Sequence, residues 1–342
     1  MQESEEQKAL FNVPDKKREE EIEIYHDEGY ERKNNPFIHQ FIAVPIRSKE
    51  LLYSLLECIR KKYDKNKNLT IKWSKIRKNT FARNKIAKEW LELLQEATYQ
   101  KSFKYCINSK PIFKKSLGIK ISTIFINSLD DLSDNFYENT KTPGEKRRKK
   151  YESLMRMGIQ GLTSFCFNPE YTNYDRVFIK RLYTDGEYGS IPIDGKKIIN
   201  KLEWNSRNYV QIDADKIEGV KKDKNKTAEV DFEELTDLVL GVTRYLCGHE
   251  ERNEIKDKIV EPIREVYNKK ERNKKGWEAS GHYRTFSVSR CEIENGKLTF
   301  KRMPIIQDEE ICDRNINQMQ LNLFLKLCQN NDQKNKKLKY LP

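Results

Sequence analysis

The chain has 342 residues, 37% of them hydrophobic and 35% charged, so it is polar but long enough to bury a sizeable core. Lysine and arginine number 66 against 53 acids, a formal net charge of +13 that favours a polyanionic partner, nucleic acid before membrane. No uncharged apolar run of about 18 residues is present, and the first ten residues, MQESEEQKAL, carry no apolar signal core. We therefore expect a cytoplasmic protein without a membrane partner.

The reactive side chains are scattered. The seven cysteines form no C-x-x-C pair, and the four histidines form no H-E-x-x-H motif, so neither a disulfide framework nor a structural zinc is expected. No glycine-rich nucleotide loop has the required spacing. Any metal would be held by oxygen ligands.

The first 20 residues are charged and have no period, which predicts a flexible tail. Strand and helix signals then alternate. Strands are predicted over 21–25, 37–46, 68–76, 103–108 and 118–127, and helices over 48–63 and 79–100.

After a polar, turn-rich loop, a basic helix is predicted to begin near Glu145 and the alternation continues. Strands are predicted over 175–183 and 209–220, and helices over 195–206 and 231–248. Strands joined by connections long enough to be helical indicate an α/β sheet layered with helices.

The chain beyond residue 248 has a different character. A charged helix over 254–270, a hairpin over 282–304 and a basic tail follow one another. We interpret residues 21–248 as one α/β domain and residues 249–342 as a C-terminal helix and hairpin appendage with a basic tail.

The first stretch of chemical interest ends the first predicted strand. Asp27 and Glu28 follow it directly and precede Gly29, which permits a tight turn. The pattern fits either a solvated strand end or a carboxylate site.

The second stretch lies in the helix predicted over 231–248. Asp237, Gly241 and Arg244 follow one another at i, i+4 and i+7 on a face beside the apolar stripe. A mid-helix glycine costs about 1 kcal/mol of helix propensity. We therefore expect another backbone or a ligand to approach closely at Gly241, although an acid at the edge of an ordinary amphipathic helix is the alternative.

Four motifs in this order resemble the prokaryotic "domain of unknown function 3800" family, whose fold is similar to RNase H. They are YHDEG over 25–29, TIKWSKIRK over 70–78, VFIKRLYT over 177–184 and LTDLVLG over 235–241. The resemblance spans residues 21 to about 248. It implies an RNase H-like mixed sheet and a cluster of acids that holds Mg²⁺ or Mn²⁺ for phosphodiester cleavage.

This chain departs from the family pattern at two of the four acids. Thr70 stands where the family favours Glu, and Lys180 stands where it favours Asp. We expect Asp185, beyond the same strand, to supply a replacement carboxylate. The alternative is that Lys180 pairs with Asp27 and occupies the metal's place.

The expected site therefore comprises Asp27, Asp185 and Asp237 as metal ligands, with Glu28 as a further ligand or base. In an RNase H-like sheet the first strand lies beside the fourth and parallel to it. Acids that leave these two strands would meet at one edge, and a helix acid would close the third side.

Basic runs are the candidates for phosphate contacts, and the run over 71–85 is the strongest because aromatic rings interleave with its charges. A solvated loop or helix face is the alternative for any single run, and Trp73 could equally belong to the core. The expected nucleic-acid contacts are Lys72, Trp73, Lys75, Arg77, Lys78, Arg83, Arg147, Arg148 and Arg244.

These patterns predict a metal-dependent nuclease acting on DNA or RNA, and the resemblance implies a role in prokaryotic defence, with a protein partner in a defence complex as a further expectation. The rival is a catalytically degraded protein on the same fold that binds nucleic acid or serves as a scaffolding subunit of a larger complex.

Overall fold

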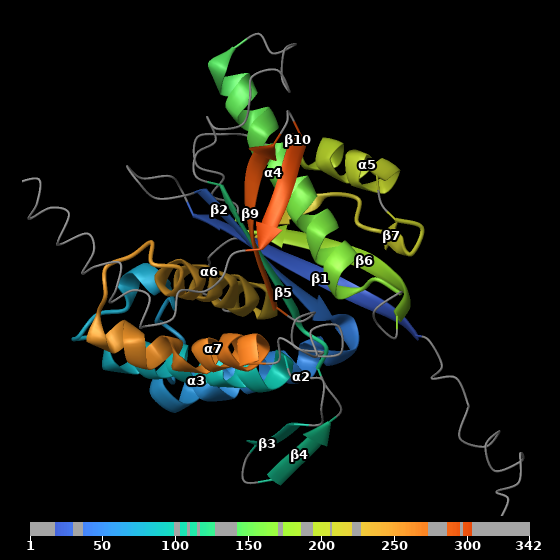
Figure 1. Ribbon diagram of the computed structural model, residues 1–342. Coiled ribbons are helices and arrows are strands. Elements are labelled where there is room, and N and C mark those ends of the chain that lie inside the picture. Colours follow the sequence, from blue (N-terminus) through green and yellow to red (C-terminus); the bar gives the residue numbers. More distant parts are fainter. Residues whose placement is uncertain are drawn as a thin grey trace, which may run out of the picture.

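The computed structural model describes residues 18–29, 37–98, 103–107, 110–114, 117–126, 142–169, 174–185, 194–205, 207–220, 227–272, 286–294 and 297–302. They form a mixed α/β fold in which helices cover both faces of a central sheet (Figure 1). Within these residues no helix is long and apolar enough to cross a membrane. Of the tail predicted over 1–20, the first 17 residues lie outside the described chain.

The central sheet has eight strands in the order β10-β9-β5-β2-β1-β6-β7, and β8 also pairs with β6. Its strands are β1 (Arg18–Gly29), β2 (Phe37–Pro45), β5 (Lys120–Ile126), β6 (Tyr174–Thr184), β7 (Val210–Ile212), β8 (Ile217–Gly219), β9 (Phe286–Glu294) and β10 (Lys297–Arg302). β1 lies between antiparallel β2 and parallel β6. β6 is the fourth strand of this sheet along the chain.

The helices divide between the two faces of the sheet (Figure 1). One face carries α2 (Ile46–Tyr63), α3 (Phe81–Thr98), α6 (Ala228–Leu246) and α7 (Glu254–Arg272), and the other carries α4 (Pro143–Cys166) and α5 (Gly195–Asn205). Each layer closes its own apolar core. Successive residues of β1 supply both cores, since Tyr25 packs on the α6 side while Ile22 and Ile24 pack on the α4 side.

β1 extends the first predicted strand in both directions. It begins at Arg18, inside the predicted tail, and continues through Gly29, which pairs with Ile38 of β2. Asp27 and Glu28 therefore lie within a paired strand, and the prediction of a turn at these residues is wrong. Pairing on both sides, by β2 and β6, holds this segment extended.

The strand predicted over 68–76 is also wrong. This segment is irregular apart from a short 3₁₀ helix, η1 (Trp73–Lys75). Two of its backbone N–H groups, those of Ile71 and Trp73, donate to carboxylates of α6 at 3.2 and 2.8 Å. Because side chains satisfy these donors, the segment needs no partner strand.

The remaining differences concern short strands. The strand predicted over 209–220 is divided into β7 and β8, both parallel to β6. The strand predicted over 103–108 forms β3 (Phe103–Ile107), which pairs only with β4 (Lys110–Lys114) in a separate hairpin. The C-terminal hairpin forms as expected, and its first strand, β9, adds to the central sheet beside β5.

Candidate functional site

The carboxyl ends of β1 and β6 bring two acids together. The two strands run parallel, and His26 of β1 is paired with Thr184 of β6. Asp27 and Asp185 each follow one residue beyond that pair. Parallel pairing therefore carries both carboxylates to the same end of the sheet, which is the juxtaposition expected from the sequence.

Three carboxylates converge there. One oxygen from each of Asp27, Glu28 and Asp185 lies within 4.8 Å of the others, in a group that could hold a metal ion. Asp27 is 6% exposed and Glu28 is 7% exposed, while Asp185 is half-buried. Carboxylate oxygens are the ligands that hard cations such as Mg²⁺, Ca²⁺ and Mn²⁺ prefer, so the donor set fits a divalent cation of this class.

The surroundings of Asp27 are strongly acidic. Burial raises the pKa of its carboxyl group well above the usual value, and Asp237, Asp185, Glu28 and Glu233 raise that pKa further, in decreasing order. Like charges that crowd a buried carboxylate disfavour its ionised form. A bound cation would relieve this repulsion.

Asp237, which the sequence suggested as a central ligand, lies at the border of this cluster. It is close enough to raise the pKa of Asp27, but it does not belong to the three-carboxylate group. One of its oxygens accepts a 2.8 Å hydrogen bond from the backbone N–H of Trp73. Asp237 therefore links the carboxylate cluster to the segment over 64–80.

Gly241 provides the contact surface for the same segment. A Cβ atom at this position would lie 1.9 Å from Cγ of Trp73, closer than any real contact. The close approach expected at this mid-helix glycine is therefore made by an indole ring. Trp73 is only 5% exposed, and its Nε1–H donates to Glu250 at 2.6 Å.

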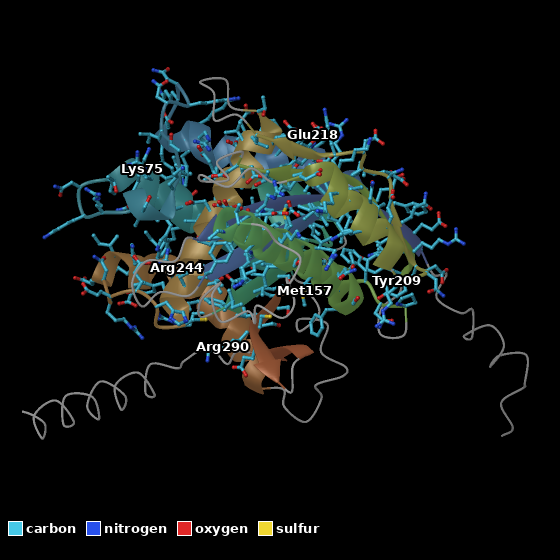
Figure 2. The ribbon with its side chains drawn as sticks, turned by 90° about the horizontal axis from the view of Figure 1, so that it is seen from above. Lys75, Met157, Tyr209, Glu218, Arg244 and Arg290 are labelled. Carbon is cyan, nitrogen blue, oxygen red and sulfur yellow. The ribbon has the colours of Figure 1, made fainter. Side chains whose placement is uncertain are left out.

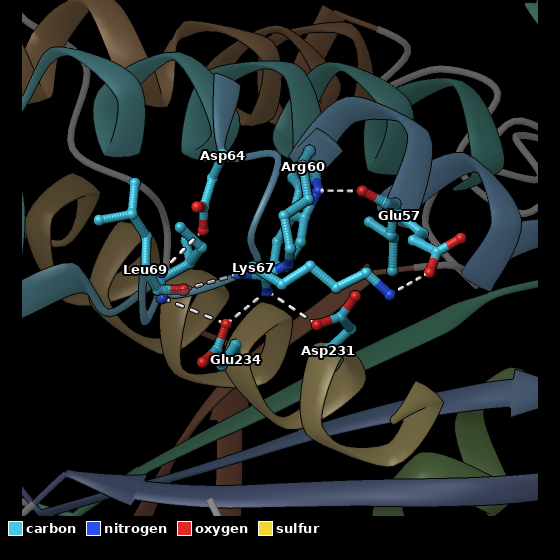
Figure 3. A network of polar contacts seen from close by, with 10 residues as sticks. Glu57, Arg60, Asp64, Lys67, Leu69, Asp231 and Glu234 are labelled. Atoms are coloured by element: carbon cyan, nitrogen blue, oxygen red, sulfur yellow. Dashed lines mark hydrogen bonds and ion pairs between the residues drawn. The ribbon is translucent and has the colours of Figure 1, made fainter. Parts of the chain in front are cut away.

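A buried arginine fastens the other end of the segment (Figure 3). Arg60 of α2 is fully buried and donates to Asp231 and Glu234 of α6 at 2.7 and 2.6 Å. It also donates to the backbone carbonyl of Leu69 at 2.7 Å. The segment over 64–80, which carries the exposed basic side chains and is called the basic segment below, is thus held against α6 on both sides of Thr70.

Two buried histidines lie under Glu28. Nε2 of His26 and Nδ1 of His39 are joined by a 2.8 Å hydrogen bond, and Nδ1 of His26 lies 3.8 Å from Oε2 of Glu28. Burial lowers the pKa of His26 to about 3 and lowers that of His39 as well. Both rings are therefore neutral at physiological pH, and they leave the charge of Glu28 available to a cation.

Lys180 and Thr70, the two positions where an acid was missing from the expected motifs, make other contacts. Lys180 pairs with Glu21 and Asp213 at 2.9 and 2.8 Å on the β6 surface. The alternative in which this lysine occupies the metal's place is therefore wrong, because its amine is engaged by these two acids and the last four residues of β6 separate it from Asp185. The carbonyl of Thr70 accepts a hydrogen bond from Nε of Arg83 at 2.8 Å.

The predicted nucleic-acid contacts between residues 72 and 83 differ in their exposure. Lys75, Arg77 and Lys78 are exposed, and the neighbouring Phe81 is 69% exposed. Trp73 belongs to the core, so its ring is not available for stacking on a base and the core alternative applies. Lys72 and Arg83 are half-buried on the same segment.

The remaining predicted contacts lie elsewhere. Arg148 of α4 is half-buried and lies 3.7 Å from the buried Glu152 in an i, i+4 pair. The side chain of Arg147 lies outside the described residues. Arg244 is half-buried near the end of α6, and Figure 2 shows it toward the same side of the molecule as Lys75.

Sequence reasoning missed His26, His39 and Glu233. The spacing of His26 and Glu28 puts both side chains on one face of a strand, and Glu233 precedes Asp237 by one helical turn. Both spacings could therefore have indicated His26 and Glu233 from the sequence. The pairing that brings His39 opposite Glu28 depends on the register of β2 and could not be derived locally.

Comparison with known proteins adds no relative: no protein-family model, curated protein or solved structure gives a significant match to this chain.

Proposed function

We propose that this protein is a divalent-metal-dependent nuclease with an RNase H-like fold. The observation that carries the proposal is the convergence of Asp27, Glu28 and Asp185 at the carboxyl ends of two parallel strands. The strand arrangement supports it, because β1 lies beside the fourth strand of the sheet and parallel to it. The motifs of the "domain of unknown function 3800" family point to the same fold.

In this proposal Asp27 and Asp185 are the ligands of Mg²⁺ or Mn²⁺, and Glu28 is a further ligand or the base that takes a proton from water. Such a cation supplies activation of water and stabilisation of the leaving oxygen. Asp237 closes the site from α6 and fixes the basic segment through Trp73. The hydrogen-bonded pair of His26 and His39 lies beside Glu28, with Nδ1 of His26 3.8 Å from its carboxylate.

The substrate class follows from charge. The chain carries a formal +13, and the exposed cations Lys75, Arg77 and Lys78 lie on the segment that Asp237 and Glu234 hold against α6. A polyanion bound along this segment would reach the carboxylates, and its phosphodiester bonds are the groups that a carboxylate-held cation cleaves. A role in prokaryotic defence with a protein partner is part of the proposal through the family resemblance alone.

The test is a cleavage assay on single- and double-stranded DNA and RNA with Mn²⁺, Mg²⁺ or EDTA. Loss of a catalytic ligand in Asp27→Asn or Asp185→Asn should reduce cleavage at least about 100-fold, the size of effect expected for a group acting on the transition state. Asp213→Asn removes an exposed carboxylate paired with Lys180 and serves as the matched control. Full activity of a purified Asp27→Asn protein would refute the proposal.

A binding or scaffolding protein on the same fold is the second candidate, favoured by the exposed basic segment. Tight binding of an oligonucleotide without cleavage under any metal condition would establish it. Lys180, which in the alternative would occupy the metal's place, pairs with Glu21 and Asp213 instead, and this removes one argument for this candidate.

A further inference from the structure

Three basic side chains gather on the α6 face of the sheet, next to the carboxylate cluster. Gly29, Ile38, Phe125 and Arg290 are successive register partners on β1, β2, β5 and β9. They form one row across the sheet. Gly29, at one end of this row, lies two residues beyond Asp27 on the same strand.

The end of α6 brings two more side chains to this row. A Cβ atom on Gly29 would lie 3.7 Å from Cδ of Arg244, so the arginine stem runs over the glycine. The helix then ends in a turn with Gly248 at a φ of 76°, and the N–H of His249 donates to the carbonyl of Arg244 at 3.0 Å. This turn places the ring of His249 on Phe125, with the ring centroids 5.4 Å apart.

These side chains have polar atoms without partners. Within the described part of the chain, neither Arg244 nor Arg290 pairs with a carboxylate, and the buried Nε atoms of both arginines and Nε2 of His249 have no hydrogen-bond partner. Burial lowers the pKa of His249, and Arg290 and then Arg244 lower it further, so both guanidinium groups act on the same ring. Two half-buried positive charges that no described carboxylate neutralises are costly.

We propose that Arg244, His249 and Arg290 form a binding subsite for a phosphate oxyanion beside the carboxylate cluster. Guanidinium groups match the geometry of phosphate and bind it with two parallel hydrogen bonds. A neutral imidazole adds one donor. Figure 2 labels Arg244 of α6 and Arg290 of β9, two elements that lie 40 residues apart in the sequence.

The subsite adds a second contact to the proposed nuclease. Only the assignment of the bound phosphate to a nucleic-acid backbone rests on the proposed function. Asp237 of α6 would then lie beside the phosphodiester bond that is cleaved. Arg244 of the same helix would lie beside a different phosphate of the same nucleic-acid strand. A nucleic-acid backbone offers such phosphates in series, whereas a free phosphate or nucleotide offers the same oxyanion alone.

Binding can be measured without any metal, in EDTA. Inorganic phosphate and a short single-stranded oligothymidylate are titrated into the full chain by calorimetry. Arg290→Gln should weaken both interactions about tenfold, equivalent to about 1.4 kcal/mol, and Arg244→Gln with Arg290→Gln should weaken them further. Arg176→Gln, which removes an exposed arginine of β6, is the charge-matched control and should change phosphate affinity less than twofold.

The outcomes separate the subsite from the nuclease. Unchanged phosphate and oligonucleotide affinity in the folded double variant overturns the subsite, whether or not the protein cleaves nucleic acid. Weakened phosphate affinity supports it even if no cleavage is found. A loss confined to inorganic phosphate supports the subsite with a free phosphate as its ligand, and a loss for both probes supports the backbone. Asp27→Asn should retain phosphate binding while it loses cleavage.

Discussion

Asp27, within β1, and Asp185, just after β6, each lie one residue beyond the pair that His26 and Thr184 form between these parallel strands. With Glu28 they form a compact carboxylate group whose members repel one another. A cation that binds this group should therefore stabilise the folded protein. Linkage gives roughly 2.7 kcal/mol when the metal concentration is about 100 times the dissociation constant.

Metal stabilisation is checked by thermal unfolding with and without Mn²⁺. The wild-type protein should gain melting temperature with added Mn²⁺, and Asp27→Asn should not. In EDTA the Asp27→Asn protein should be more stable than wild type, because the substitution removes a buried charge that its neighbours disfavour. A wild-type protein indifferent to Mn²⁺ and Mg²⁺ at millimolar concentrations would argue against a metal site here.

The close contact between Gly241 and Trp73 predicts a large effect from one methyl group. Gly241→Ala would place Cβ 1.9 Å from Cγ of the indole, so the segment must shift. Overpacking of this kind costs about 1–3 kcal/mol, measured by urea denaturation. Gly161→Ala on α4 is the control, because nothing lies within 4 Å of its Cβ position. That substitution should stabilise the protein by up to about 1 kcal/mol through helix propensity.

The buried ion pairs of Arg60 predict a second stability effect. Arg60→Met would leave Asp231 and Glu234 buried without their shared cation. Removal of one partner from such a network costs about 3–5 kcal/mol. Lys61→Met removes an exposed cation from an i, i+4 pair with Glu57 on the same helix and should cost less than about 0.5 kcal/mol. Equal stabilities of the two variants would show that the network contributes nothing.

The neutral state of the His26 ring predicts that the free energy of unfolding depends on pH. Its folded pKa is about 3 against a usual 6.5, so folding favours the uncharged ring. The resulting stability is complete above about pH 6.5 and is lost as the pH falls from there toward 3. The raised pKa of Asp27 acts in the opposite direction, since its protonation on acidification favours the folded state. The contribution of His26 is therefore the difference in free energy of unfolding between wild type and His26→Gln across this range, and a difference independent of pH contradicts the assignment.

The exposed basic segment predicts salt-dependent binding of single strands. Replacing Arg77 and Lys78 by Gln removes two cations and should lower the slope of log affinity against log salt by about 1.4, at about 0.7 per phosphate contact. Phe81→Ala should weaken binding by about 1–3 kcal/mol if the exposed ring stacks on a base. The measurement is fluorescence anisotropy with a labelled oligonucleotide in EDTA. Arg176→Gln with Arg207→Gln, two exposed arginines elsewhere, should leave the slope unchanged.

Features that depend on neighbouring residues could be predicted from the sequence. The periods of two and 3.6 residues located most strands and helices, and the alternation of these elements indicated an α/β class. Local spacing also identified the acids at 27, 28 and 237, the glycine at 241 and the possibility that Trp73 is buried.

Contacts between residues far apart in the sequence settle which of these residues meet. The register between β1 and β6, set by pairs more than 150 residues apart, brings Asp185 into the carboxylate group and leaves Lys180 outside it. The packing of α6 places Asp237 near Asp27 but outside that group. Docking of the segment over 64–80 on α6 replaced a predicted strand, because carboxylates of a distant helix satisfied its backbone donors. Such contacts depend on long-range packing, and no local pattern in the chain records them.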